Sequence, residues 1–272
     1  MLIKKSADED FEFEVNKNFY YLTGINQDNV CLIMVKENGN YSEYLFLEKN
    51  DPIKVKWIGA KLEKEEAIMI GCFDNVLYYD EYDLKEFVNL YLNKGIINVY
   101  TNIEKDNHFY NFEEEYINKL IDRKNIIYLS GYEIGVNLRT YKEEYEIALL
   151  KESIEVTKTG IEELMLNSMP GMLEYELESY FDFHIKNNGQ RSNSFKTIAA
   201  GGKNATILHY SSNNCELNDG DLVLFDLGCK TNFYCSDITR TFPVNGVFTE
   251  RQKEVYKEVL NVNKKCIEFL KP

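Results

Sequence analysis

The sequence predicts a mixed fold of the α/β (α+β) class with two domains, residues 1–135 and residues 136–272. Strand-like runs alternate with helix-like segments as far as residue 129, a pattern typical of helices layered on a partly parallel sheet. After the boundary, two long segments with helical periodicity precede several short strand-like runs. The chain has 272 residues, 44% of them hydrophobic, which suffices for one large or two medium-sized cores.

The sheet of the first domain is predicted to begin with a β-hairpin. Residues 30–35 form a continuous apolar run, residues 43–47 form a second, and the turn between them contains Asn38 and Gly39. An Asn-Gly pair between two such runs favours a tight hairpin turn. The other elements predicted for this domain are strands at residues 75–79, 96–100 and 126–129 and helices at residues 61–69, 82–92 and 112–121.

The second domain is predicted to begin with a long amphipathic helix that ends at the Met169-Pro170-Gly171 turn. The apolar residues that recur at helical spacing along it are Ile147, Leu150, Ile154, Ile161 and Leu164. A second helix is predicted at residues 175–186, followed by strands at residues 195–199, 206–210, 222–227 and 233–242. A last helix begins at Thr249, where Gln252 completes a capping box, and its apolar stripe requires a covering surface.

Composition limits the classes of partner. The formal net charge is −14, which makes nucleic acids and anionic membranes poor partners and suits divalent cations and peptide amino termini. The first residues leave no room for the apolar core of a signal peptide, and no run approaches the length of a membrane helix. The six cysteines form no Cys-x-x-Cys pattern, so we expect reduced thiols in a cytoplasmic protein.

The segment 221–243, DLVLFDLGCKTNFYCSDITRTFP, contains two aspartates in strand-like runs. A turn at residues 231–232 would place Asp226 directly opposite Asp237, with their Cβ atoms about 5 Å apart. Two carboxylates in one site resist joint ionisation, and Asp226 would be buried among apolar neighbours at a high cost. A divalent cation removes both penalties, because hard cations favour carboxylate oxygens. The segment therefore predicts half of a metal site.

A second interpretation of this hairpin stays open. Arg240 or backbone amides could satisfy one aspartate while water solvates the other. Thr239 lies on the same predicted face as Asp237 and could orient it.

His209 is the histidine with a candidate role. It follows the Gly201-Gly202 turn, and it could contact substrate or donate a proton beside the metal. The alternative is a half-buried strand histidine that bonds to the backbone. His108 and His184 are expected to be structural, and the sequence contains neither His-Glu-x-x-His nor Gly-x-Ser-x-Gly, so nothing indicates covalent catalysis.

Three stretches carry a family resemblance: AAGGKNATILHY at residues 199–210, the aspartate segment, and FTERQKEVYKEVL at residues 248–260. Together they resemble the first half of a pita-bread metallopeptidase domain, and its Xaa-Pro aminopeptidase (aminopeptidase P) branch is the nearest. Near the N-terminus, FYYLTGI, LFLEKNDP and Lys56-Trp57-x-Gly59 resemble that family's creatinase-like N-terminal domain.

The resemblance implies a metal-dependent aminopeptidase that releases the N-terminal residue from peptides with proline at position two. Asp226 and Asp237 match the first two of five protein ligands to a dinuclear centre, usually manganese, and His209 matches a histidine that holds substrate near the scissile bond. Family members are often dimers or tetramers, so the resemblance also implies a homo-oligomer.

The remaining ligands of the family, one histidine and two glutamates, lie beyond residue 272, so the resemblance implies a fragment with an incomplete catalytic domain. Two alternatives to the aminopeptidase follow. One is a non-catalytic pita-bread module that binds partners. The other is a prolidase-type dipeptidase or amidinohydrolase of the same architecture, although LFLEKNDP and FYYLTGI favour the aminopeptidase branch.

Overall fold

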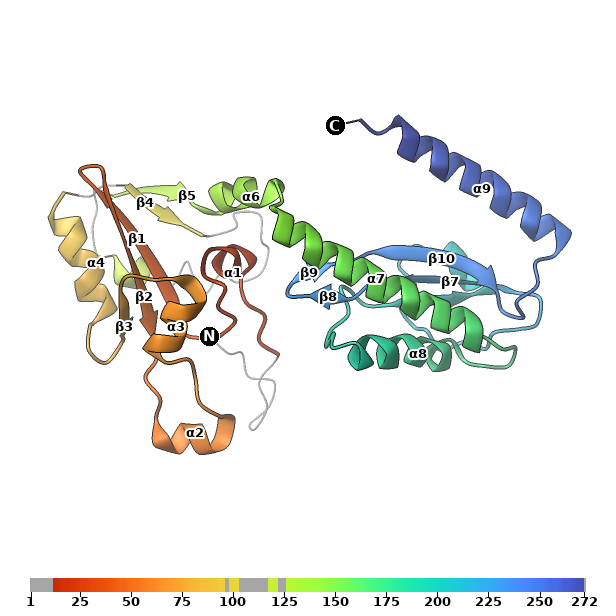
Figure 1. The fold of residues 1–272 in the computed structure, drawn as a ribbon, viewed down its shortest axis with the longest axis horizontal. Coiled ribbons are helices and arrows are strands. Elements are labelled where there is room, and N and C mark those ends of the chain that lie inside the picture. The colour runs from red at the N-terminus through yellow and green to blue at the C-terminus, as the bar shows by residue number, and fades with distance from the viewer. Residues whose placement is uncertain (1–11, 96–97, 103–116, 122–125, 272) are drawn as a thin grey trace. The chain divides into compact units, whose positions relative to one another are not determined.

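The structure, a computed structural model, describes residues 12–95, 98–102, 117–121 and 126–271 (Figure 1). The predicted helix at residues 112–121 lies largely outside this part, as do residues 96–97 of a predicted strand and His108. The chain divides into two compact units, Met1–Tyr141 and Lys142–Pro272, and both mix helices with strands, as the sequence predicted. Across the described residues, no helix is long and apolar enough to cross a membrane.

Unit 1 contains a three-stranded sheet in the order β1-β2-β3, with an antiparallel β1–β2 pair and a parallel β2–β3 pair. A separate two-stranded parallel sheet joins β4 to β5. The strands are β1 Cys31–Glu37, β2 Asn40–Leu47, β3 Val76–Tyr78, β4 Asn98–Thr101 and β5 Ile127–Ser130. The helices are α1 Lys17–Thr23, α2 Pro52–Ile58, α3 Lys64–Gly71, α4 Leu84–Asn93 and α6 Tyr132–Thr140.

The predicted hairpin is confirmed. Asn38 and Gly39 have φ values of 50° and 84°, the left-handed pair that a tight hairpin turn requires, and Glu37 pairs with Asn40. Successive side chains of strand β2 point to opposite faces of the sheet. Leu45 packs in a core with Ala67 of α3, whereas the ring of Phe46 on the other face lies 5.1 Å from the ring of Phe87 in α4.

Helix α2 was not predicted, although the Asp-Pro pair at its start is a good signal. The Asp51 side chain caps the helix by accepting a hydrogen bond from the Ile53 amide at 2.8 Å, and Pro52 occupies the first turn. The helix exposes three large apolar side chains, Ile53, Trp57 and Ile58.

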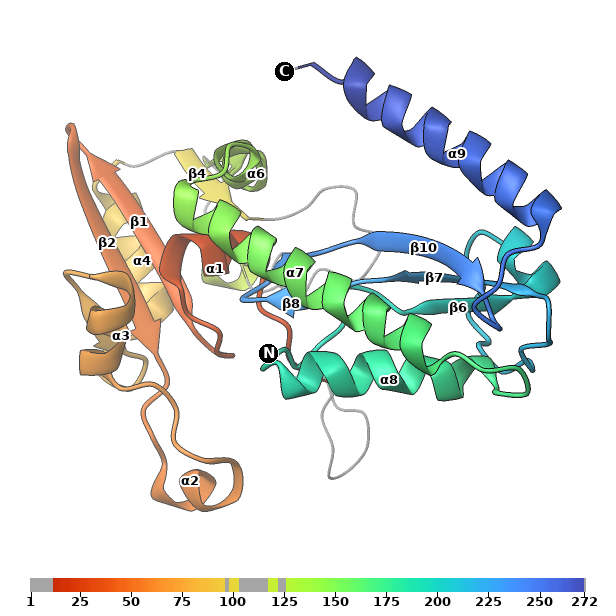
Figure 2. The same ribbon diagram turned by 45° about the vertical axis from the view of Figure 1, so that its right-hand side comes forward.

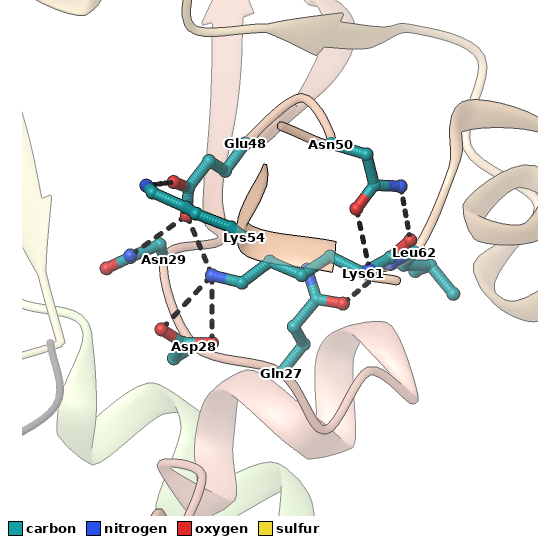
Figure 3. Close-up of polar contacts among 8 residues, drawn as sticks. All are labelled: Gln27, Asp28, Asn29, Glu48, Asn50, Lys54, Lys61 and Leu62. Carbon is teal, nitrogen blue, oxygen red and sulfur yellow. Dashed lines mark hydrogen bonds and ion pairs between the residues drawn. The ribbon is translucent and has the colours of Figure 1, made fainter. Parts of the chain in front are cut away.

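A polar network, the Lys61 clamp, closes the base of the segment that carries α2 (Figure 3). The Lys61 Nζ lies 2.7 Å from Glu48 Oε2 and 3.1 Å from Asp28 Oδ1, and its side chain is only 15% exposed. Asn50 accepts a bond from the Lys61 amide and donates one to the Lys61 carbonyl. The two ends of the segment 51–60 are thereby joined. The clamp comprises Gln27, Asp28, Asn29, Glu48, Asn50, Lys54, Lys61 and Leu62.

Unit 2 is an antiparallel sheet in the order β10-β7-β6, with helices α7 and α8 packed on one face (Figure 1, Figure 2). The strands are β6 Ile198–Gly201, β7 Leu222–Leu227, β8 Lys230–Thr231, β9 Tyr234–Cys235 and β10 Ile238–Pro243. The helices are α7 Glu144–Asn167, α8 Glu174–Asn187, the 3-10 helix η1 Gly202–Thr206 and α9 Glu250–Phe269. The core between helices and sheet includes Leu164, Leu177, Phe181, Val223, Phe225 and Leu227.

Some predicted elements of unit 2 differ from the structure. The predicted strand at residues 206–210 is wrong, because η1 ends at Thr206 and no strand follows before β7. In α7, Ile161 and Leu164 are buried as predicted, but Ile147 and Ile154 are 40% and 46% exposed. The capping box of α9 at Thr249 is confirmed, and no residue of that helix is buried.

Candidate metal centre

The β7–β10 hairpin brings the two aspartates together in a register that differs from the predicted one. Asp226 pairs with Thr239, because the turn falls at Asn232 and Phe233, which both have positive φ. The predicted direct pairing of Asp226 with Asp237 is therefore wrong by two residues along one strand. An even shift preserves the face on which each side chain lies, and both aspartates line the same pocket.

The environment of the two carboxylates also differs from the prediction. Asp226 is half-buried rather than buried, because it points to the open face of the sheet while its neighbours Phe225 and Leu227 point to the helices. Asp237 is exposed. The Thr239 hydroxyl donates a 2.7 Å hydrogen bond to Asp226 Oδ1. Thr239 therefore orients Asp226, whereas the sequence predicted that it would orient Asp237.

The pair is electrostatically uncompensated. Although the Asp237 side chain is exposed, the neighbouring protein atoms partly desolvate its carboxyl group, and this effect and then the adjacent Asp226 carboxylate raise its pKa above the ordinary value. Within the described part of the chain, neither aspartate forms an ion pair with lysine or arginine. Arg240 donates instead to the Thr239 carbonyl. Two hard oxygen donors with mutual repulsion fit a divalent cation, which would remove that repulsion.

A buried junction separates the two aspartates along the chain. The Cys229 carbonyl accepts hydrogen bonds from Ser153 at 2.6 Å and Ser194 at 2.8 Å, and the Cys229 amide donates to Ser236 at 3.0 Å. A Cβ atom at Gly228 would lie 1.9 Å from the Ser236 carbonyl oxygen, so only glycine fits there. Because Ser236 turns inward, the predicted strand at residues 233–242 is interrupted between β9 and β10. Sequence reasoning missed this junction.

His209 and the two aspartates line one pocket of about 410 Å³, on the face of the sheet away from the helices. His209 is exposed and follows η1, so the alternative of a half-buried strand histidine is wrong. Its neighbour Tyr210 is buried and also lines the pocket. The other lining residues are Phe195, Lys196, Ile198 and Ser211. His184 lies elsewhere, with Nε2 2.9 Å from the Thr159 hydroxyl of α7, in a structural contact.

These residues do not make a complete metal centre by themselves. In the ranges that the structure describes, no group of three or more histidine, cysteine, aspartate or glutamate side chains is arranged to hold a metal ion. The pocket lining contains no glutamate. Two carboxylates supply only part of the coordination shell of a hard cation, because such ions take six or more ligands.

Comparison with known protein families identifies both halves of the chain. Residues 3–100 match the aminopeptidase P N-terminal domain, and residues 148–272 match metallopeptidase family M24. The first part of the chain is thus similar to the aminopeptidase P N-terminal domain and the second part to the metallopeptidase domain of family M24. The proteins of family M24 are metallopeptidases, and a match to that family implies dependence on a divalent metal.

The individual relatives include several Xaa-Pro aminopeptidases. The chain is 34% identical over 280 residues to Xaa-Pro aminopeptidase 3 of Dictyostelium discoideum, a match that covers 98% of this chain and 53% of the relative. Among solved structures, proline aminopeptidase P II from Yersinia pestis aligns with a TM-score of 0.90 and 32% identity, covering 100% of this chain and 63% of that one. A variant of Escherichia coli aminopeptidase P in complex with substrate aligns with a TM-score of 0.88 and 30% identity, with the same coverage. The chain thus spans between about half and two thirds of the length of these relatives.

Proposed function

We propose that the protein is a metal-dependent aminopeptidase that releases the N-terminal residue from peptides with proline at position two. Asp226 and Asp237 are the proposed metal ligands, Mn²⁺ is the proposed metal, and His209 is the proposed substrate contact. The observation that carries the proposal is the uncompensated aspartate pair, which shares one pocket with His209. The similarity to Xaa-Pro aminopeptidases over nearly the whole chain supports the choice of substrate.

Each residue contributes in a way that its position permits. Asp226 is held by the Thr239 hydroxyl, which leaves its second oxygen available to a cation. Asp237 lines the same pocket and supplies further oxygens. The imidazole of His209 can hydrogen-bond a peptide group in the pocket. When bound, divalent metal supplies a water of lowered pKa and stabilises the charge that develops on the scissile carbonyl.

A peptide-cleavage assay tests this function. The chain is incubated with Mn²⁺ and either Ala-Pro-Ala or Ala-Ala-Ala, and release of the first alanine is followed by mass spectrometry. Release from the proline peptide alone, abolished by a chelator and by Asp226→Asn, supports the proposal. Release that persists in the chelator contradicts the metal dependence. Saturable Mn²⁺ binding without cleavage of either peptide contradicts the catalytic proposal and favours the non-catalytic binding module.

We also propose a homo-oligomer located in the cytoplasm. Large exposed apolar side chains support self-association, among them Trp57 of α2 and Val259 and Phe269 of α9. All six cysteines are free thiols, which supports a reducing compartment. Light scattering of the purified chain tests the first point, and a monomeric mass at micromolar concentration would contradict it. Fractionation of the source cells tests the second.

A further inference from the structure

Glu174, the first residue of α8, is a fully buried carboxylate that the proposed chemistry does not use. Oε1 accepts hydrogen bonds from the Gly201 amide at 2.7 Å and the Asn204 side chain at 3.0 Å. Oε2 accepts from the Tyr210 hydroxyl at 2.7 Å and the Cys215 amide at 3.0 Å. Each oxygen therefore has two donors, and all four donors come from the segment 201–215.

Only neutral groups compensate this charge in the described chain. No lysine or arginine there forms an ion pair with Glu174. A buried carboxylate is costly unless hydrogen bonds satisfy it, and these four bonds are charge-assisted and directional. The position at the start of α8 adds the favourable field of a helix N-terminus. The carboxylate can therefore stay buried only while the segment keeps its conformation around it.

The segment 201–215 carries His209 and has little regular structure of its own. After η1 ends at Thr206, no helix or strand holds residues 207–215. Tyr210, next to His209 in the chain, both lines the pocket and donates to Glu174.

A second acid of α8, Glu178, also bonds to the C-terminal part of the same segment. The Asn213 side chain donates to Glu178 Oε2 at 2.9 Å and accepts from the Ala199 amide of β6 at 3.2 Å. Glu174 and Glu178 lie one helical turn apart, so one face of α8 holds both ends of the stretch that contains His209.

We propose that Glu174 is a positioning residue that orients the segment 201–215 and thereby directs His209 into the pocket with Asp226 and Asp237. The importance of His209 for substrate rests on the proposed function. The structural dependence of the segment on Glu174 does not, and it is measurable without metal or peptide.

The first arm of the test uses amide hydrogen exchange of the metal-free chain. Glu174→Gln places an amide donor among four donors, so we expect exchange of residues 202–212 to accelerate by about 30-fold or more. Tyr210→Phe removes one donor and should accelerate exchange of these residues by about fivefold. This variant is less disruptive to folding than Glu174→Gln. Exchange in β7 and β10 should change less than twofold.

The chain offers matched controls. Glu146 is also buried at the start of a helix and also accepts from a tyrosine, Tyr234, at 2.6 Å. It lies in α7, and its hydrogen bonds in the described chain come from Glu143 and Tyr234, outside the segment. Glu146→Gln and Tyr234→Phe should therefore leave exchange of residues 202–212 unchanged. Equal acceleration by both sets of variants, or none in Glu174→Gln and Tyr210→Phe, would overturn the proposal.

The second arm reads the orientation of His209. Its imidazole Hε1 signal is assigned by its loss in His209→Gln, and substoichiometric Mn²⁺ is added. The expected result is broadening of this signal in the parent chain and at least threefold weaker broadening in Tyr210→Phe or Glu174→Gln, at a Mn²⁺ affinity within twofold of the parent. Undiminished broadening would overturn the proposal. Failure of the parent chain to bind Mn²⁺ would instead contradict the proposed function, and the exchange arm would still decide the role of Glu174.

Discussion

Unit 1 contains the Lys61 clamp, and unit 2 contains Glu174 with its four hydrogen-bond donors, here called the Glu174 anchor. Both bind an irregular segment, but they use different chemistry. The clamp sets one cation between two carboxylates, and water reaches it, since Glu48 is 26% exposed. The anchor sets one carboxylate among four neutral donors and is fully buried. Ion pairs near the surface tolerate changes of geometry, whereas directional bonds to a buried charge do not.

The difference corresponds to what each segment presents. The clamp closes the base of α2, which displays apolar side chains to solvent. The anchor lies behind the segment whose His209 and Tyr210 line the pocket. Precise placement of a side chain matters at a site of binding or catalysis. The directional hydrogen bonds to Glu174 accordingly lie next to the proposed site.

The largest expected effect comes from backbone packing, which also differs between the units. In Gly228→Ala, the added Cβ would lie 1.9 Å from the Ser236 carbonyl oxygen, so we expect unit 2 to lose roughly 4 kcal/mol or to fail to fold. In Gly39→Ala the Cβ meets nothing within 4 Å, and only the φ of 84° opposes it, at about 1 kcal/mol. Urea unfolding followed by hydrogen exchange of each unit measures both losses. Equal losses would contradict the close approach at Gly228.

The next effect breaks the clamp. Lys61→Met removes the cation between Asp28 and Glu48, two partly buried carboxylates, and we expect a loss of about 2 kcal/mol in unit 1. Lys54→Met is the control, because Lys54 is 60% exposed and forms its ion pair with Glu48 at the surface, and it should cost less than about 0.5 kcal/mol. Exchange in unit 2 should not change in either variant. Similar losses in the two variants would show that the buried position of Lys61 adds nothing to the stability of unit 1.

The smallest expected effect is a pH dependence of the stability of unit 1, which arises from Glu48 in the clamp. Hydrogen bonds from Lys54, then Lys61 and then Asn29 lower the pKa of Glu48 from 4.5 to about 2. A depressed carboxyl pKa stabilises the folded state above the unfolded value, and this contribution is lost as pH falls from about 4.5 towards 2. After allowance for solvent screening we expect a loss of about 1 kcal/mol in unit 1. Denaturant unfolding at pH 5 and pH 3 measures it, and Lys61→Met should show a weaker dependence.

Local sequence signals predicted the features whose causes are local. The hairpin at Asn38-Gly39 and the capping box at Thr249 depend on neighbouring residues, and both are confirmed. The common face of Asp226 and Asp237 was predicted correctly from a wrong register, because alternate side chains along a strand share a face. The turn itself could not be placed, since Thr231-Asn232 and Asn232-Phe233 differ by one residue.

Features that depend on distant partners were missed or misassigned. Glu174 reads as an ordinary first-turn acid of a helix, and its donors lie 27 to 41 residues further along the chain. Ser153 breaks the apolar pattern of α7, but its partner Cys229 is 76 residues away. The predicted strand at residues 206–210 is wrong, and Tyr210 at its end donates instead to Glu174, 36 residues away in the chain.

A calorimetric titration of the chain with Mn²⁺ tests the proposed metal centre most directly. The aspartate pair predicts saturable binding that Asp226→Asn and Asp237→Asn abolish, while Asp219→Asn, an exposed aspartate outside the pocket, leaves it unchanged. Circular dichroism of each variant should match that of the parent chain. Binding of equal affinity in the parent and in both pocket variants would contradict the assignment of Asp226 and Asp237 as metal ligands.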